Sequence, residues 1–231
     1  MFGKINTSIL LAITSLFLFV GCGSSDSNDD NKKTRQYKVS LKNITSAQPF
    51  APAAIIVENS STDFNAYKIG QVSSLGLETL AESGNPQVLL DEANTEEVLY
   101  TNSFDGLTTP GSTGEIVFTV DNENLKLSIL SMLVKTNDAF VAANDIDLNF
   151  TGTKTFNLNV YDAGTEANDE LATTVPGLTG EGFNAQRNDT NNFVTLHSGL
   201  VTVDDGLSSS ALSFSDRWDN PAAVLTIERI K

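Results

Sequence analysis

The sequence is poor in the residues that most hydrolases use for catalysis, with one cysteine (Cys22) and one histidine (His197). It contains neither G-x-S-x-G nor H-E-x-x-H, so it offers no serine nucleophile elbow and no zinc-protease helix. One cysteine cannot form an intramolecular disulfide, so the fold must be stabilised by its core. His197 ends the run NFVTLH, which predicts a strand-end side chain with one satisfied hydrogen bond; the other interpretation is a base or a metal ligand.

The sequence also lacks an apolar run long enough to cross a bilayer as a helix. Its most apolar stretch, ILLAITSLFLFV, follows Lys4 and is shorter than the roughly 20 residues of a transmembrane helix, as is typical of a signal peptide. It ends in FVGC, where a small residue precedes Cys22 as in a lipobox, with Phe19 in the usual place of Leu. We predict a lipoprotein signal peptide over residues 1–21 and a lipid on Cys22. Ordinary signal cleavage nearby, which would leave a free thiol, is the alternative.

Positive charge is scarce, because 14 Lys and Arg stand against 29 Asp and Glu, a net charge of −15 that is spread along the chain. Such a protein does not bind nucleic acid or anionic lipid by simple electrostatics, but it attracts cations. We therefore expect no nucleic-acid partner, and membrane attachment only through the lipid on Cys22. The predicted location is extracytoplasmic, on the cell envelope; Gly23 after the cysteine, rather than Asp, favours the outer membrane of an organism that has one.

The mature chain divides by composition into a polar segment and an apolar-patterned domain. Residues 22–36 read CGSSDSNDDNKKTRQ, which predicts a disordered tether. From Tyr37 apolar residues recur to Lys231, so residues 37–231 are expected to form one domain, large enough to bury roughly 70% of its unfolded surface.

Short period-two runs separated by turn residues dominate this domain and predict an all-β fold. The expected strands are YKVSLKN, AAIIVEN, EIVFTVD, LKLSILSMLV, FNLNVYD, NFVTLH and AAVLTIERI, with EEVLYTN as a less certain run. VSSLGLETLAESGNP instead has a helical apolar face, with Gly84 where a helix C-cap is expected and Pro86 just beyond the helix. We predict an antiparallel β-sandwich of eight strands with one short helix. The connection 163–192 is long enough to be functional or mobile.

An acidic loop, NVYDAGTEANDE (159–170), follows one predicted strand and contains no Lys or Arg. Gly164 can take the positive φ that folds the chain back, so Asp162 and Glu166 could point at one centre. Hard cations such as Ca²⁺ take six to eight oxygen ligands, often from loops. The spacing does not match an EF-hand, since Gly164 and Ala167 stand where that motif needs other residues. A solvated acidic loop is the alternative.

A third carboxylate must come from another loop, and Asp138 in KTND follows a strongly apolar strand. If that strand neighbours the one ending at Asp162, the carboxylates meet at one end of the sandwich. Asp145 and Asp147 are candidates of lower rank. The alternative for Asp138 is a solvated turn in which it bonds its own backbone.

Four segments occur in the order AESGNP, LSILSMLVKTNDAF running into DIDL, YDAGTE and AAVLTIERI. With these segments the chain resembles the spondin N-terminal domain family of F-spondin, mindin and many bacterial lipoproteins. The resemblance extends from about Tyr37 to Ile230. It implies an eight-stranded antiparallel sandwich, similar to calcium-dependent membrane-binding modules, and a bound Ca²⁺. The ligands that it implies fall on Asp138, Asp162 and Glu166, where Glu replaces the Asp usual in animal members.

The function expected from the resemblance is a lipid-anchored, calcium-binding module that binds a surface protein or a glycan, as animal members act in adhesion. The thrombospondin-type repeats of animal members are missing, as the single cysteine shows. Two alternatives stay open at this point. One is an envelope enzyme that acts on glycans through paired carboxylates, and the other is a structural envelope component without a ligand.

Overall fold

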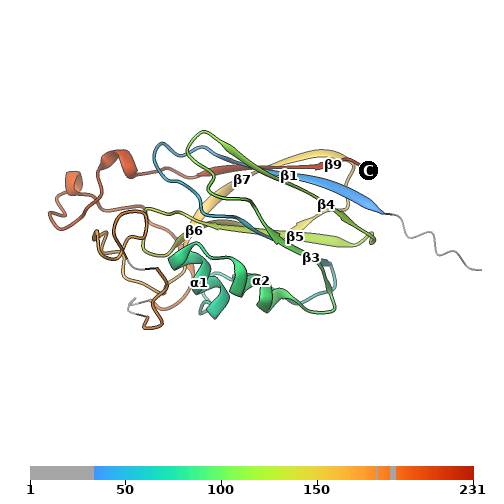
Figure 1. Cartoon of the computed structure of the whole chain (residues 1–231), viewed down its shortest axis with the longest axis horizontal. Coiled ribbons are helices and arrows are strands. Elements are labelled where there is room, and N and C mark those ends of the chain that lie inside the picture. Colours follow the sequence, from blue (N-terminus) through green and yellow to red (C-terminus); the bar gives the residue numbers. More distant parts are fainter. Residues whose placement is uncertain (1–33, 181, 188–190) are drawn as a thin grey trace, which may run out of the picture. The chain divides into compact units, whose positions relative to one another are not determined.

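One long strand belongs to both sheets of the computed structural model, which describes residues 34–180, 182–187 and 191–231 (Figure 1). In these ranges the strands are β1 (Arg35–Asn43), β2 (Ala54–Asn59), β3 (Val98–Ser103), β4 (Thr113–Val120), β5 (Leu125–Met132), β6 (Ala139–Asp147), β7 (Gly152–Asp162), β8 (Thr195–Leu196) and β9 (Ala223–Arg229). The helices are α1 (Leu75–Ser83) and α2 (Gln87–Ala93), with two 3-10 turns, η1 (Val203–Asp205) and η2 (Phe214–Asp216).

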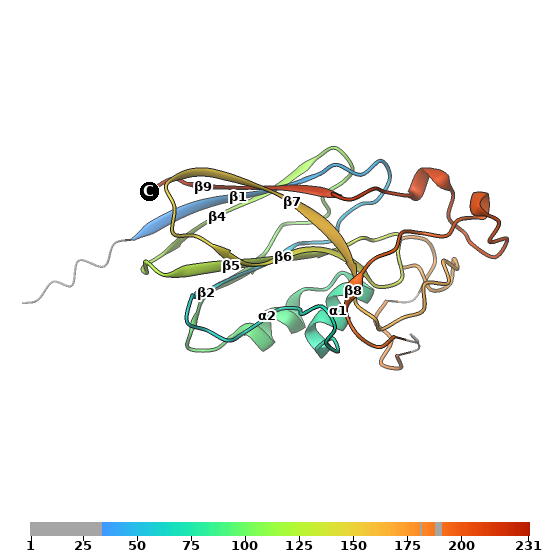
Figure 2. The same cartoon turned by 180° about the vertical axis from the view of Figure 1, so that it is seen from behind.

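The two sheets are joined through β7, and every strand pair is antiparallel. Residues 152–158 of β7 pair with β9, whereas residues 159–162 pair with β6. The first sheet has the order β4-β1-β9-β7, and the second has the order β3-β2-β5-β6-β7, with β8 on the far part of β7. Figures 1 and 2 show these sheets as two layers, with α1 and α2 against the outer face of the second layer.

Two apolar cores lie on either side of the second sheet. The first core lies between the layers and takes Tyr37, Val39 and Leu41 of β1 together with alternate residues of the other strands. The second lies between the second sheet and the helices, where Leu77 and Leu80 of α1 meet residues of β2, β5 and β6. The middle of the second sheet is therefore covered on both faces, and β2 and β5 are buried at nearly every position rather than at alternate ones.

The predicted helix is confirmed, but a second helix follows it. Ser74 caps the start of α1 by accepting a hydrogen bond from Leu77 N at 3.1 Å, and Gly84 ends it in the left-handed conformation at φ 69°. Pro86, which we expected only to follow the helix, stands at the start of α2. A proline is well accommodated at a helix start because its missing N–H has no intrahelical partner there.

Strand β6 was not predicted, because its sequence AFVAANDID shows no alternation. Its first four residues are buried on both faces, and Asp145 then takes a positive φ of 56° beside a register shift between β5 and β6. The start of β1 also corrects a prediction. Arg35 and Gln36, expected at the end of the tether, belong to this strand, since Arg35 pairs with Val120.

The all-β antiparallel sandwich is confirmed, and eight of the described strands form one continuous path from β3 to β4, with β8 beside it. The predicted strands are all present, although NFVTLH is reduced to the two residues of β8. The predicted signal peptide 1–21, Cys22 and the tether up to residue 33 lie outside the described residues. No helix in the described part of the chain is long and apolar enough to cross a membrane.

The second core should contribute strongly to stability through Phe140. This fully buried residue of β6 packs its ring 5.3 Å from that of Tyr67 and 5.7 Å from that of Tyr161. We expect Phe140→Ala to lower the free energy of unfolding by about 3–5 kcal/mol in urea denaturation. Val117→Ala on β4, where the side chain is 49% exposed, is the control and should change it by less than about 0.5 kcal/mol. Equal effects of the two variants would contradict this assignment of the core.

Candidate metal centre

The pairing of β6 with β7 brings the predicted ligands to one end of the second sheet. Ala139 at the start of β6 stands opposite Asp162 at the end of β7. Asp138, one residue before β6, therefore lies beside the loop that follows β7, and its carbonyl accepts from Ala163 N at 3.2 Å. The neighbour of β7 is thus β6, which follows Asp138, and not the apolar strand β5 that precedes it.

The DAGTE loop is folded around Asp138. One carboxylate oxygen, Oδ2, accepts hydrogen bonds from Thr165 N at 2.8 Å, Thr165 Oγ1 at 3.1 Å and Glu166 N at 3.0 Å. Asp138 is fully buried, and its other oxygen, Oδ1, has no hydrogen-bond partner among the described residues. The solvated turn that was the alternative for Asp138 is wrong, since water does not reach it.

Gly164 has the positive φ that the sequence predicted, at 69°. A Cβ at this position would lie 2.4 Å from the carbonyl oxygen of Phe193, so the loop also needs the absence of a side chain. Gly164 N donates to Asp162 Oδ1 at 2.7 Å, and Asn168 Nδ2 donates to Asp162 Oδ2 at 2.6 Å. These contacts hold the Asp162 carboxylate inside its own loop.

The three predicted ligands are buried without a positive charge beside them. Asp162 and Glu166 are each 7% exposed, and none of the ion pairs formed between described residues includes Asp138, Asp162 or Glu166. Burial, and then the charge of Asp162, raise the pKa of Asp138. Burial raises the pKa of Glu166 to about 8, with smaller contributions from the charges of Glu82, Asp138 and Asp169. Asp138 and Glu166 therefore keep their protons to a higher pH than exposed carboxyl groups do.

Two further acids extend this cluster. Burial raises the pKa of Glu170 to about 7; one of its oxygens accepts from Val201 N at 3.1 Å, and Oε2 has no partner in the described residues. Asn137 bridges the group, since its Nδ2 donates to Asp169 Oδ1 at 3.1 Å and its Oδ1 accepts from Glu170 N at 3.4 Å. Asp169 and Glu170 belong to the acidic stretch NVYDAGTEANDE (159–170), but no spacing rule identifies them as ligands.

The donor chemistry of the cluster fits a hard divalent cation. Its carboxylates supply oxygen ligands of the kind that Ca²⁺ takes, and the unpartnered Oδ1 of Asp138 is a buried acceptor that lacks a donor. As the side chains stand, no three His, Cys, Asp or Glu residues in the described ranges converge closely enough to hold a metal ion. Ligation would therefore require side-chain rotation.

The lower-ranked candidates Asp145 and Asp147 lie away from the cluster. They stand at the other end of β6 and line a second, smaller pocket together with Lys126. Lys126 Nζ pairs with Asp145 Oδ1 at 2.7 Å. These two acids therefore do not join Asp138 at one centre.

His197 lies between the cluster and a surface groove. Its Nδ1 accepts from Gly199 N at 2.9 Å, whereas its Nε2 is buried without a partner in the described chain. Burial lowers its pKa, and the nearby charge of Asp162 opposes this. The other face of His197 meets Trp218, whose ring lies 5.1 Å away in an edge-on contact. Since Nδ1 accepts a hydrogen bond, the proton of the neutral ring is on Nε2, which does not suit a metal ligand.

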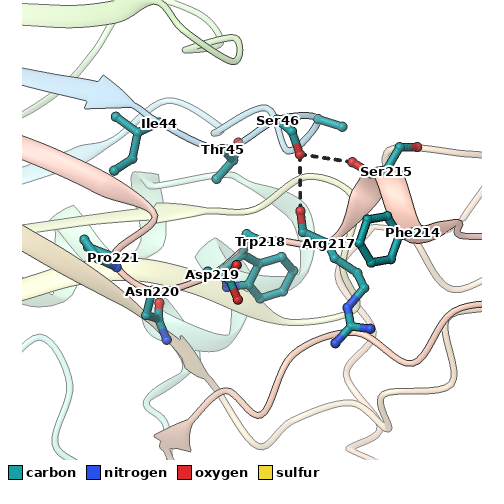
Figure 3. A pocket seen from close by; sticks show the side chains of 11 residues that line it. Ile44, Thr45, Ser46, Phe214, Ser215, Arg217, Trp218, Asp219, Asn220 and Pro221 are labelled. Atoms are coloured by element: carbon teal, nitrogen blue, oxygen red, sulfur yellow. Dashed lines mark hydrogen bonds between the residues drawn. The ribbon is translucent and has the colours of Figure 1, made fainter. Parts of the chain in front are cut away.

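The groove beside Trp218 has a volume of about 820 Å³ (Figure 3). Its lining comes from the connection after β1 and from the segment that leads into β9, with Ile44, Phe214, Trp218 and Pro221 as apolar members and Ser46, Arg217, Asp219 and Asn220 as polar ones. Phe214 is 69% exposed. Trp218 packs against the first core and also lines the groove.

A family model described as Spondin_N matches residues 36–176, which include β1 to β7 and all three predicted ligands. The chain belongs to the spondin N-terminal domain family. The match covers more than half of the chain, and the sandwich built around β7 is the structure of this spondin domain. No protein with a curated description matches the chain.

The raised pKa values make the metal-free spondin domain sensitive to pH. Between pH 6.5 and 8 the unfolded chain has released the protons of Glu166 and Glu170, while the folded protein retains part of them. The free energy of unfolding should therefore fall as the pH rises through this range. Urea denaturation in EDTA at pH 6.5 and pH 8 measures this effect, and Glu166→Gln should reduce the difference. A stability that rises from pH 6.5 to 8 would contradict these pKa directions.

Proposed function

We propose that this spondin domain is a calcium-dependent binding module, displayed outside the cytoplasm on a lipid anchor at Cys22. Asp138, Asp162 and Glu166 would hold the ion. The observation that carries the proposal is the fully buried carboxylate of Asp138. Its Oδ1 has no hydrogen-bond partner among the described residues, and no ion pair between them includes Asp138, Asp162 or Glu166. Membership of the spondin family supports an extracellular module of the binding type.

When bound, the ion supplies positive charge that offsets the repulsion between these carboxylates. The carboxylates of the protein determine the position of the ion. Asp138 already holds the backbone of Thr165 and Glu166 through Oδ2, so its free Oδ1 can bind the cation without loss of those contacts. The loops after β7 would then be more rigid in calcium than without it.

The groove beside Trp218 is the surface on which we place the partner, a protein or a glycan of the cell surface. His197 links the groove to the metal centre, since its ring contacts Trp218 and the charge of Asp162 influences its pKa. Figure 2 shows that the connection after β7 and the segment with η1 and η2 lie at the same end of the sandwich. Aromatic and polar side chains together suit a specific, partly apolar ligand.

The two other functions have less support. An enzyme that uses paired carboxylates needs an acid of raised pKa in a cleft, but the groove is lined by none of the acids whose pKa burial raises. A purely structural component would not need a groove with an exposed phenylalanine. Hydrolysis of surface glycans by the purified protein would favour the enzyme, and unchanged adhesion of cells without the protein would favour the structural component.

Calcium should stabilise the purified protein against heat. At about a hundred times its dissociation constant, a ligand adds roughly 2.7 kcal/mol, which for a domain of this size raises the melting temperature by about 5–10 °C. We expect this rise on changing from EDTA to millimolar Ca²⁺, and its loss in Asp162→Ala and Asp138→Asn. Asp147→Asn removes an equal charge at the other end of β6 and should keep it. A melting temperature that does not respond to Ca²⁺ at all would refute the calcium site.

The lipid anchor is tested independently of calcium. In cells that express the protein, wild type should partition with membranes and into detergent, whereas Cys22→Ser should not carry the lipid. Metabolic labelling with a radioactive fatty acid, followed by gel electrophoresis, distinguishes the two. Equal labelling of both proteins, or of neither, would argue against lipidation of Cys22 and for ordinary signal cleavage.

A further inference from the structure

Helix α1 carries two glutamates one turn apart, and both are buried against the connection that follows β7. Glu78 pairs with Arg187, whose guanidinium also donates to Ser73 O at 2.7 Å. Glu82 accepts from Asn184 N at 2.8 Å through Oε2. Glu78 is 4% exposed and Glu82 is 1% exposed. The two acids therefore attach residues 184–187 to the helix.

The charge of Glu82 acts on the metal centre, and its second oxygen is not used by Asn184. Glu82 Oε1 is buried and has no hydrogen-bond partner among the described residues. After burial, the charge of Glu82 is the largest influence that raises the pKa of Glu166. Burial raises the pKa of Glu82, and Asn184 N and the nearby hydroxyl of Thr165, which donates to Asp138 Oδ2, partly oppose this rise. Glu82 thus approaches the DAGTE loop from the helix side.

We propose that Glu82 is a fourth carboxylate of the cation centre, and that its Oε1 binds the ion from α1. This inference rests on the calcium site proposed above. Three carboxylates fill at most six positions if each binds through both oxygens, and Ca²⁺ takes six to eight oxygens. Glu82 is a buried acid with one oxygen free, whereas Glu78 on the same helix is engaged by Arg187.

Ligation by Glu82 would give the ion a wider structural role. Asn184 is bonded to the other oxygen of the same carboxylate, so movement of Glu82 on ion binding would be transmitted to residues 184–187. The ion would then connect three parts of the fold, namely helix α1, the start of β6 and the loop after β7. Removal of the ion would loosen the attachment of the long connection as well as the DAGTE loop.

Glu82→Gln and Glu78→Gln form a matched pair that tests this role by calcium titration calorimetry of the purified protein. Both variants remove one negative charge from α1, and the glutamine at position 82 keeps an oxygen for Asn184 N. We expect Glu82→Gln to weaken Ca²⁺ binding by about tenfold or more, and Glu78→Gln to change it by less than about threefold.

Melting in EDTA supplies the second readout. Without the ion, the charge of Glu82 repels Glu166, and the glutamine keeps an acceptor for Asn184 N. Glu82→Gln should therefore melt at or above the wild-type temperature in EDTA and below it in Ca²⁺. A residue with a merely structural role would shift both temperatures in the same direction. If Glu82→Gln does not fold, Glu82→Asp keeps the charge but shortens the side chain, and it should likewise weaken Ca²⁺ binding.

The results separate this inference from the calcium site itself. Wild type that binds Ca²⁺ and is weakened by Asp138→Asn, but not by Glu82→Gln, would overturn the role of Glu82 and leave the three-carboxylate site standing. Equal weakening by Glu78→Gln and Glu82→Gln would reduce the effect to distant charge and also overturn it. Wild type that binds no Ca²⁺ would overturn both proposals.

Discussion

The structure depends on the division of β7 between two sheets. Because residues 152–158 pair with β9 and residues 159–162 pair with β6, one strand closes the sandwich and then delivers its last residue to the edge of the other layer. The register Ala139 opposite Asp162 follows from that crossing. Asp138 and the DAGTE loop would not meet without this pairing, since Asp138 precedes β6 and the loop follows β7, at the open end of the same hairpin. The acidic centre is thus a consequence of how the sheets are joined.

Carboxylates gathered in this way would repel one another if all were ionised in a buried place. The protein accommodates them partly with backbone N–H donors, of which Asp138 receives two, and partly by holding protons. Arg187 is directed to Glu78 on the outside of the group and does not enter it. An arginine inside would have satisfied the acids permanently. Among the described residues the centre lacks one, and the cation that we propose would supply the missing positive charge.

The sequence allowed the class of fold and part of this site to be predicted. Alternating runs identified the half-buried strands, and Gly164 identified the turn, because both signals are local. Strand β6 and helix α2 escaped prediction, since burial on both faces removes alternation and a proline was taken as the end of a helix rather than the start of one. Glu82 is distant in sequence from Asp138 and Glu166, and only packing of α1 on the second sheet places it beside them.

Trp218 is the only tryptophan in the chain, and its position gives the protein a built-in optical probe. Trp218 lines the groove and also contacts His197, whose pKa is influenced by the charge of Asp162. All indole emission therefore originates at the wall that the groove shares with the acidic end of the sandwich. A spectral change on adding an ion or a candidate partner can be assigned to this wall without a label or an engineered fluorophore.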